Sequence, residues 1–450
     1  MLDPLELAGL ALEHASGEAL AAVTRERSLT LRFAAGRPTQ ATSIDDVTVE
    51  LAVVRAGKVG RAATNVVEDE SLAACARRAA AAAEAAVMVS GPGPYPGFPP
   101  PAAGRPHDGH DAETAALDPG CGGGALAEAF EIARSAGLEA HGIWTAAEEQ
   151  HAVASSSGAG VHDRTTDAFM KVICIAPSGR SGYAARTAVA ASRLDAAALA
   201  ECAAGKTTAR GEQATLAPGE YDVVFEAHAV GALLDLLGAT AFNGLAHAEG
   251  RGALAGRLGH RVAAPAVNLS DSPRLRGTLP RAFDAEGTPK APLPLIQDGV
   301  AHRVVHDSRS AALAGERSTG HALAPGGAPD GPHPTNLVLA GGGAADEAEL
   351  CAPLERGVYV TRLWYTNVVR PKETLITAVT RDGTFLIEDG RIGRPLRELR
   401  ITDSVLGILE RTQALGARQQ LTSDGEFYGR RFAFGVVCPP LRARAVRFTG

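Results

Sequence analysis

The sequence predicts an α+β fold. Two observations support this class: residues 1–90 read as helix, strand, strand and helix, and residues 218–450 contain many short strands between glycine-rich turns. The chain has 450 residues, enough for two or three domains with sizeable cores. We predict a small N-terminal α/β domain at residues 1–90, a Pro/Gly-rich linker at 91–111, a central domain with a mixed sheet at 112–214, and a mostly antiparallel, β-rich C-terminal domain at 218–450.

The N-terminal elements are predicted from two apolar patterns. A spacing near 3.6 residues predicts a helix over residues 5–22, and alternation predicts strands at 29–33 and 47–55. The second strand leads into Arg-Ala-Gly-Lys, which is typical of a hairpin turn. An alanine-rich run predicts a helix over residues 71–89, with Ser71 as a candidate N-cap.

Two glycine-containing stretches follow. Gly-Pro-Gly-Pro-Tyr-Pro-Gly-Phe-Pro-Pro-Pro favours an extended, semi-rigid connector over a ligand for a proline-binding module. The glycine-rich segment 120–124 lacks the Lys-Ser/Thr pair and the preceding strand of a phosphate-binding loop. We therefore do not assign it to phosphate binding.

The remaining elements alternate between short helices and strands. In the central domain, helices are predicted at 125–136 and 197–204, and strands at 138–145, 150–155, 167–176 and 182–187. In the C-terminal domain, strands are predicted at 357–365, 375–380, 432–437 and 441–448, a hairpin at 384–395, and helices at 229–237 and 403–413.

The composition argues against several classes of protein. The net charge is −7 and there is no basic stripe, so we expect no binding to nucleic acid or to an anionic membrane. No apolar run approaches the roughly 18 residues of a membrane-spanning helix, and the first residues do not read as a signal peptide. The six cysteines never show Cys-x-x-Cys spacing, which predicts free thiols. These features predict a cytoplasmic protein.

Motifs within residues 218–395 carry a family resemblance. They include Pro-Gly-Glu-Tyr-Asp-Val-Val-Phe at 218–225, Asp-Ala-Glu-Gly at 284–287, Ser-Thr-Gly-His at 318–321 and Pro-Thr-Asn at 334–336. In this order they resemble the TldD/PmbA family, also called modulators of gyrase. The family comprises paired cytoplasmic proteins, of which TldD-like members are zinc peptidases and PmbA-like (TldE-like) members are their partners. The resemblance implies a role in peptide cleavage.

The zinc motif distinguishes the two branches. A zinc peptidase of this family carries His-Glu-x-x-x-His on the helix after the Val-Val strand, with a downstream cysteine as a further ligand. The equivalent segment here, residues 225–238, has no His-Glu pair; His228 stands too early, and Gly231–Leu237 are apolar apart from Asp235. The stretch 422–429, which resembles the family's Cys-Gly motif, has no cysteine, and we interpret Cys438 as a core thiol. The resemblance therefore implies the metal-free, PmbA-like branch, with no metal ligand and no catalytic residue in this chain.

Two other groups of titratable residues offer alternatives. His302 and His306 have the spacing of a zinc helix, but no glutamate follows the first and Val304-Val305 favours a strand, so we interpret them as structural or surface residues. Asp284 and Glu286 have the chemistry of an acid–base pair. Because the family carries Asp-x-Glu-Gly in both branches, we assign them instead to a turn or to the substrate groove.

An asparagine and an aromatic-rich strand complete the candidates. Asn336 precedes a Leu-Val-Leu strand and resembles a family signature near the substrate cleft. Tyr359, Trp364, Tyr365 and Asn367 lie on one predicted strand, although only 4% of the chain is aromatic. Two interpretations stay open: core and strand pairing, or an open edge that holds an extended peptide. The predicted substrate-binding residues are Asn336, Tyr359, Tyr365, Asn367, Asp284 and Glu286.

The resulting hypothesis is a PmbA/TldE-like subunit, inactive alone, that pairs with a TldD-like zinc peptidase and helps to enclose a peptide. Zinc is then expected in the partner. Two alternatives stay open. One is a self-associating peptide-binding or scaffold protein, such as a homodimer. The other is a hydrolase with a non-standard metal site, for instance at His302 and His306.

Overall fold

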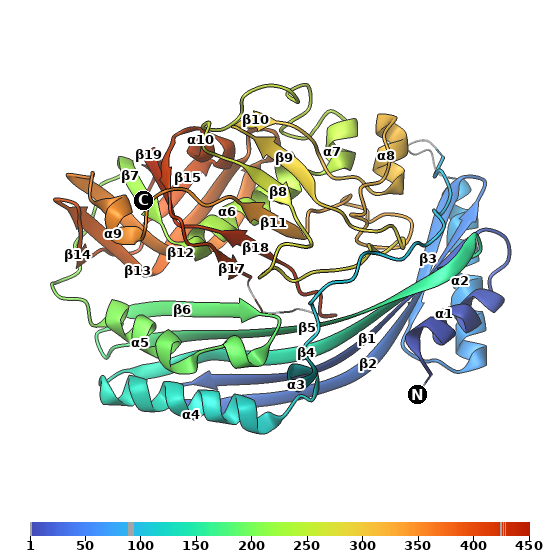
Figure 1. The fold of residues 1–450 in the computed structure, drawn as a ribbon, viewed down its shortest axis with the longest axis horizontal. Coiled ribbons are helices and arrows are strands. Elements are labelled where there is room, and N and C mark those ends of the chain that lie inside the picture. The colour runs from blue at the N-terminus through green and yellow to red at the C-terminus, as the bar shows by residue number, and fades with distance from the viewer. Residues whose placement is uncertain (1, 89–93, 424, 426, 428) are drawn as a thin grey trace.

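The computed structural model describes residues 2–88, 94–423, 425, 427 and 429–450. Within these residues the strands form three sheets. One long, curved sheet lies beneath the C-terminal half of the chain, which contains the other two (Figure 1). The structure combines helices with several sheets, and most strand pairs are antiparallel, so the predicted α+β class is confirmed.

The long sheet is six-stranded and antiparallel, in the order β3-β2-β1-β4-β5-β6. Its strands are β1 (Ala19–Ala34), β2 (Arg37–Arg55), β3 (Lys58–Thr64), β4 (Glu139–Ser155), β5 (Gly158–Ile175) and β6 (Ser181–Ala188). Strands from the regions 1–90 and 112–214 therefore share one sheet. The domain boundaries themselves stay a prediction.

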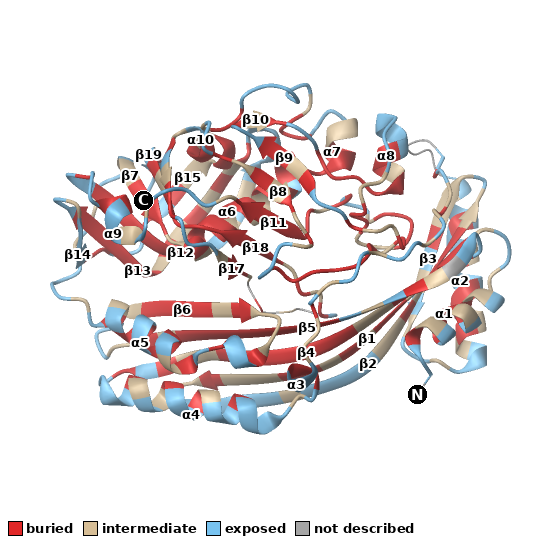
Figure 2. Cartoon of the chain, viewed as in Figure 1, coloured by how far each residue is buried: buried red, intermediate tan, exposed pale blue. Residues whose placement is uncertain are grey.

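Helices cover one face of this sheet. They are α1 (Pro4–Glu13), α2 (Asp69–Val87), α4 (Pro119–Ser135) and α5 (Ala196–Thr207), with the short α3 (Ala112–Ala115) and the 3-10 turn η1 (Ala191–Arg193) between them. In β1 the odd-numbered residues Ala19, Ala21 and Val23 pack in the core that α1 and α2 complete. Side chains alternate across a strand, so the even-numbered residues of β1 face the C-terminal half. Figure 2 shows the buried strands between exposed outer helix faces and the C-terminal half.

The C-terminal half contains two smaller sheets. The first has the order β10-β9-β8-β11-β18-β17, from β8 (Leu269–Asp271), β9 (Leu293–Gln297), β10 (Val300–Ala301), β11 (Asn336–Leu339), β17 (Gln420–Thr422) and β18 (Gly435–Cys438). The second comprises β7 (Gly219–Phe225), β12 (Arg356–Arg370), β13 (Leu375–Glu388), β14 (Arg391–Pro395), β15 (Arg400–Ser404), β16 (Thr412–Leu415) and β19 (Leu441–Phe448). Because β12 pairs with both β7 and β13, the second sheet closes into a small barrel.

Helix α6 (Ala227–Ala241) joins the two C-terminal sheets. It begins directly after β7 and packs against β12 of the barrel and β18 of the other sheet. Its buried leucines belong to the largest core of the molecule. The remaining short elements are α7 (Gly244–Ala248), α8 (Ser308–Ala314), α9 (Glu347–Cys351), α10 (Val405–Glu410) and η2 (Pro371–Glu373).

Two predictions for the N-terminal helices were wrong. The helix predicted over 5–22 ends at Glu13, and Gly17 adopts a φ of 72° before β1 begins. Pairing of β1 with β2 and β4 overrides the helical spacing of its alanines. Ser71 is not the N-cap of α2, because the helix begins at Asp69 after Glu68. The predicted end of this helix at residue 89 lies outside the described residues.

Further predicted boundaries also need correction. The strands at 138–145 and 150–155 form one strand, β4, and the helix predicted from 125 begins at Pro119, so the glycine-rich segment 120–124 is helical. The helix predicted over 403–413 is only α10, because β15 and β16 occupy its ends. The predicted strand at 432–437 begins at Gly435.

Among the described residues, no helix has the length and apolar character needed to cross a membrane.

Candidate functional site

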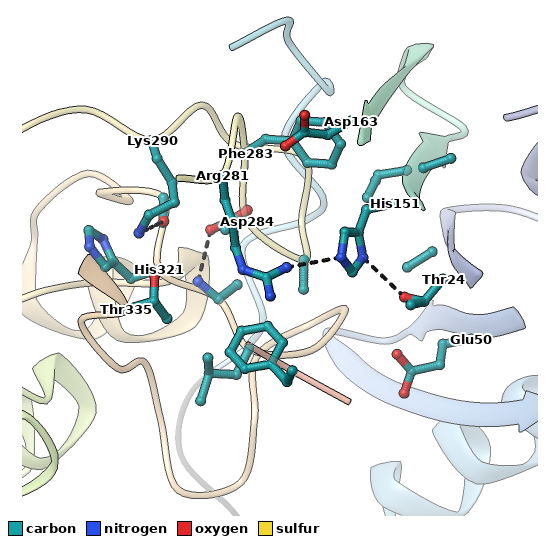
Figure 3. A pocket seen from close by; sticks show the side chains of 18 of the residues that line it. Thr24, Glu50, His151, Asp163, Arg281, Phe283, Asp284, Lys290, His321 and Thr335 are labelled. Atoms are coloured by element: carbon teal, nitrogen blue, oxygen red, sulfur yellow. Dashed lines mark hydrogen bonds between the residues drawn. The ribbon is translucent and has the colours of Figure 1, made fainter. Parts of the chain in front are cut away.

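Several hollows lie between the six-stranded sheet and the C-terminal half, and two of them contain candidate residues. The first is a cavity of about 60 Å³ bordered by β1, β4 and loops of the C-terminal half (Figure 3). The second follows β6, which pairs only with β5 among the described strands and is therefore an edge strand. It consists of two cavities of about 590 and 650 Å³ that share Arg186, Arg193 and Gln420.

We call the second hollow the β6 groove. Its walls come from residues 108–111, 184–190, 193–206, 226–228, 275–278, 345–347, 416–421, 437 and 440. Pockets for ligands usually have volumes of roughly 300–1,000 Å³. The β6 groove is therefore large enough for part of a peptide, whereas the cavity in Figure 3 is not.

The cavity in Figure 3 is surrounded by paired charges. His151 lies between Thr24, whose Oγ1 is 3.3 Å from Nδ1, and Arg281, whose Nη1 is 3.0 Å from Nε2. Arg281 also lies 3.4 Å from Glu149. Burial tends to raise the pKa of Glu149, but the His151 hydrogen bond and the charges of His151, Arg281 and Arg431 outweigh it and hold the pKa at about 2.

Arg431 makes a second buried contact between the two halves. Its Nε donates to Asp167 on β5 at 2.9 Å, and its Nη1 donates to Thr145 on β4 at 3.0 Å. Its backbone N–H donates to Glu26 on β1 at 3.1 Å. The inner face of the long sheet is thus polar and buried, and it attaches the C-terminal half. Sequence analysis missed this role; Thr24, Glu26 and Ser28 at alternate positions of β1, on the face that carries no outer helix, are the signal that could have indicated it.

Asp284 and Glu286 lie together in a buried turn. The Asp284 carboxylate accepts backbone N–H groups of Glu286, Thr288 and Ala322. Glu286 accepts from the Tyr95 hydroxyl at 2.8 Å and from a backbone N–H at 3.0 Å. Burial raises the pKa of Asp284 to about 6, and burial together with the Asp284 charge raises that of Glu286 to about 8. These contacts favour the turn role over direct substrate contact.

Asn336 belongs to a neighbouring buried cluster. Its side chain donates to Thr278 at 3.0 Å and to the Leu279 carbonyl at 2.6 Å, and its backbone N–H donates to Asp271 at 2.8 Å. Asp271 also lies 3.1 Å from His321 and 3.5 Å from Lys290. Burial lowers the pKa of His321 and of Lys290. The charge of Lys290 and the contact with His321 outweigh burial at Asp271 and lower its pKa. The motifs at 318–321 and 334–336 therefore meet inside the protein.

Tyr359 does not line the β6 groove itself, but it donates a hydrogen bond to Glu226, which does. The Glu226 carboxylate accepts from the Tyr359 hydroxyl at 2.7 Å, from Thr361 at 2.9 Å and from Lys206 Nζ at 2.9 Å. Burial tends to raise the pKa of Glu226, but the charge and hydrogen bond of Lys206 and the hydroxyl donors lower it. Glu226 and Lys206 line the groove as a closed ion pair.

His228 lies beside this pair in the groove wall. Its Nε2 is 3.0 Å from the Ala185 carbonyl oxygen, which only accepts, so Nε2 carries the proton. Burial lowers the pKa of His228 to about 4, so the ring is neutral at neutral pH. The sequence analysis considered His228 only as a zinc ligand and excluded it. The Glu-x-His pattern directly after β7 could have indicated its place beside Glu226.

Tyr365 and Asn367 lie apart from the other predicted residues. They occupy an irregularity in the pairing of β12 with β13, where Tyr365 has a φ of 46° and is 71% exposed. Asn367 is exposed and its side chain donates to the Tyr365 carbonyl at 2.9 Å. Tyr359 pairs with both β7 and β13, so it is not on an open edge. The structure therefore does not bring the six predicted residues into one site.

His302, His306 and Cys438, the residues considered as possible zinc ligands, do not form a zinc site. His302 is exposed, whereas His306 is buried with Nδ1 3.2 Å from the Ser310 hydroxyl. Their segment is a loop and not the predicted strand, with a single bridge at Val305. Cys438 is fully buried, its thiol lies 3.2 Å from a backbone carbonyl, and burial raises its pKa to about 12. Among the described residues, no three His, Cys, Asp or Glu side chains gather closely enough to hold a metal ion.

Helix α6, where the zinc motif is expected, is used for packing. Leu233, Leu234 and Leu237 are buried in the largest core. The Asp235 carboxylate lies 3.2 Å from His333 Nε2. A catalytic zinc needs three protein ligands and an open position. The donors on this helix do not fit that requirement.

Two family models match the chain. PmbA/TldA metallopeptidase C-terminal domain matches residues 218–450, and PmbA/TldA metallopeptidase domain 1 matches residues 20–83. With the fold described above, these matches define a protein of a metallopeptidase family. The chain belongs to the PmbA/TldD family.

Three known proteins are similar to this chain. A metalloprotease from Methanothermobacter thermautotrophicus is 26% identical over 200 residues, which are 44% of this chain and 43% of that protein, so less than half of either chain aligns. TldE from Thermococcus kodakarensis has a TM-score of 0.86 at 20% identity, covering 99% of each chain. A proposed modulator of a DNA gyrase from Thermotoga maritima has a TM-score of 0.84 at 20% identity, covering 99% of this chain and 98% of that one. The two structures show a shared fold.

Proposed function

We propose that the chain is the metal-free, TldE-like subunit of a cytoplasmic metallopeptidase complex, and that a TldD-like zinc peptidase is its partner. Helix α6 is the observation that carries the proposal. It occupies the expected place of the His-Glu-x-x-x-His helix directly after β7, but its leucines fill the core and Asp235 is paired with His333. Catalysis by zinc then depends on ligands from the partner.

The β6 groove supports a role in holding a peptide. Its volume suits a peptide segment, and it follows an edge strand. Glu226, Lys206 and Tyr359 form a fixed polar wall there. We place the peptide in this groove, so that Tyr359 acts by orienting Glu226 and not by direct contact.

The exposed end of β12 supports contact with another chain. Tyr365 is 71% exposed and Val369 is 50% exposed on the same strand. Exposed aromatic residues are typical anchors of protein interfaces. We therefore assign Tyr365 and Asn367 to the partner interface.

Co-expression with a relative that carries His-Glu-x-x-x-His tests the proposal. Light scattering is expected to find a mixed complex that cleaves unfolded peptides, while the chain alone does not cleave them. Tyr365→Ser is expected to weaken the complex without changing the melting temperature. Leu313→Ser on α8 is the matched control, because Leu313 is also an exposed apolar residue, 41% exposed. A stable homodimer that never takes up the zinc-motif relative would contradict the proposal and support the self-associating alternative.

A further inference from the structure

Three arginines line the β6 groove. Arg186 on β6 and Arg193 at η1 line both of its cavities, and Arg418 lies opposite them on the C-terminal half. Among the described residues, none of the three makes an ion pair or a side-chain hydrogen bond. Such a cluster stands out in a chain with a net charge of −7.

These arginines are close enough to repel one another. Burial and the charges of Arg418 and Arg193 lower the pKa of Arg186. Arg186 is half-buried, while Arg193 and Arg418 are exposed at the groove. Like charges held together without counter-charges destabilise the free protein, so the arrangement is typical of a ligand site.

The described carboxylates in the same groove do not form ion pairs with the cluster. Asp111, Asp195 and Asp346 cap the N-termini of α3, α5 and α9. Glu226 is held by Lys206, Tyr359 and Thr361. Asp108 and Glu347 also line the groove, but neither lies within ion-pair distance of an arginine of the cluster. The guanidinium N–H groups of the three arginines therefore remain available to a ligand within the part of the chain that the structure describes.

We propose that Arg186, Arg193 and Arg418 bind a carboxylate of the peptide, so that the groove selects acidic peptide segments. Arginine is suited to this task because its planar N–H fork binds a carboxylate through two parallel hydrogen bonds. The two adjoining cavities of about 590 and 650 Å³ and the edge strand β6 suit a peptide chain and not a small free anion. This inference rests on the proposed function, because it takes the groove's ligand to be the peptide.

Binding of labelled decapeptides tests the inference. We compare a glutamate-rich peptide with its glutamine-rich isostere by fluorescence anisotropy, on the chain alone and on the complex with a zinc-motif relative. The glutamate peptide is expected to bind about tenfold or more tightly, because hydrogen bonds to charged groups are the strong ones. The preference is expected to shrink in high salt. Peptides with free and amidated C-termini show whether the bound carboxylate is terminal or on a side chain.

Variants test whether the three arginines cause the preference for the glutamate peptide. Arg186→Gln and Arg418→Gln are each expected to reduce the preference for the glutamate peptide by about tenfold, while leaving the melting temperature equal or higher because repulsion is relieved. Arg77→Gln on α2 is the control, since Arg77 is exposed and lies outside the groove.

Three results would overturn the inference. They are equal binding of the two peptides in both preparations, unchanged preference in Arg186→Gln, and tighter binding of a single-stranded oligonucleotide than of the acidic peptide. None of them bears on where zinc resides. Failure of the metal-free assignment would instead appear in the metal content of the isolated chain.

Discussion

Arg431 is the residue whose contacts best explain how the C-terminal half is held on the long sheet. It is 2% exposed and paired with Asp167. Arg431→Met is expected to lower the free energy of unfolding by about 3–5 kcal/mol, because the Asp167 carboxylate is left buried without a partner. Arg430→Met is the control, since Arg430 pairs with Glu50 near the surface and such pairs are worth up to about 1 kcal/mol. Equal effects of the two variants in urea unfolding would contradict this account.

Glu286 is expected to make stability depend on pH. Its pKa is raised from 4.5 to about 8, so the folded state holds a proton that the unfolded state releases. The proton on Glu286 stabilises the folded state fully below about pH 4.5, and this stabilisation is lost as the pH rises through about 8. Between these limits the free energy of unfolding falls by about 1 kcal/mol per pH unit. Glu286→Gln is expected to flatten the fall in unfolding free energy between pH 6.5 and 8.5. A slope identical to that of the wild type would contradict the assignment.

At the residue scale, the sequence predicted the burial of one thiol but not the hydrogen-bond partners of the buried carboxylates. Cys438 was predicted as a core thiol, and it is fully buried. The hydrogen bonds of Glu226 and Glu286 reach residues more than one hundred positions away, such as Tyr359 and Tyr95. Spacing along the chain carries no information about such contacts, which form only when separate elements pack.

At the element scale, close packing of α2 on β3 depends on Gly60. A Cβ atom at this position would lie 2.0 Å from the Ala83 nitrogen and 2.2 Å from the Ala79 carbonyl oxygen. Gly60→Ala is therefore expected to displace α2 and to lower the free energy of unfolding by about 1–3 kcal/mol. Gly9→Ala in α1 is the matched control: no atom lies within 4 Å of its new Cβ, and removing a helical glycine is expected to stabilise by about 0.5–1 kcal/mol. Thermal unfolding tests whether Gly60→Ala lowers the melting temperature and Gly9→Ala raises it.

Elements with local signals were predicted well. The hairpin between β2 and β3 and the one between β13 and β14 carry turn residues that specify them, and both are present. Alanine-rich segments gave no such signal, because alanine fits a helix and, in β1, also a buried strand between two partners. The strand β4 was divided in the prediction at residues 146–149, where Glu148 and Glu149 are charged although they are buried in the strand.

At the scale of the whole molecule, the polar contact between sheet and C-terminal half leaves a groove and not a closed interior. The long sheet contributes β6 and α5 to one wall, and the C-terminal half contributes Glu226, His228 and Arg418 to the other. The sequence predicted the α+β class and the family, but the groove arises only from the packing of distant segments. Because the start of α6 lines the groove, the candidate peptide site adjoins the helix that lacks the zinc motif.

The most direct test of the central claim is zinc content by mass spectrometry. The chain is purified alone and, in parallel, in complex with a relative that carries His-Glu-x-x-x-His. We predict almost no zinc in the chain alone and about one zinc per pair in the complex, because the ligands come from the partner. About one tightly held zinc in the chain alone would contradict the metal-free assignment.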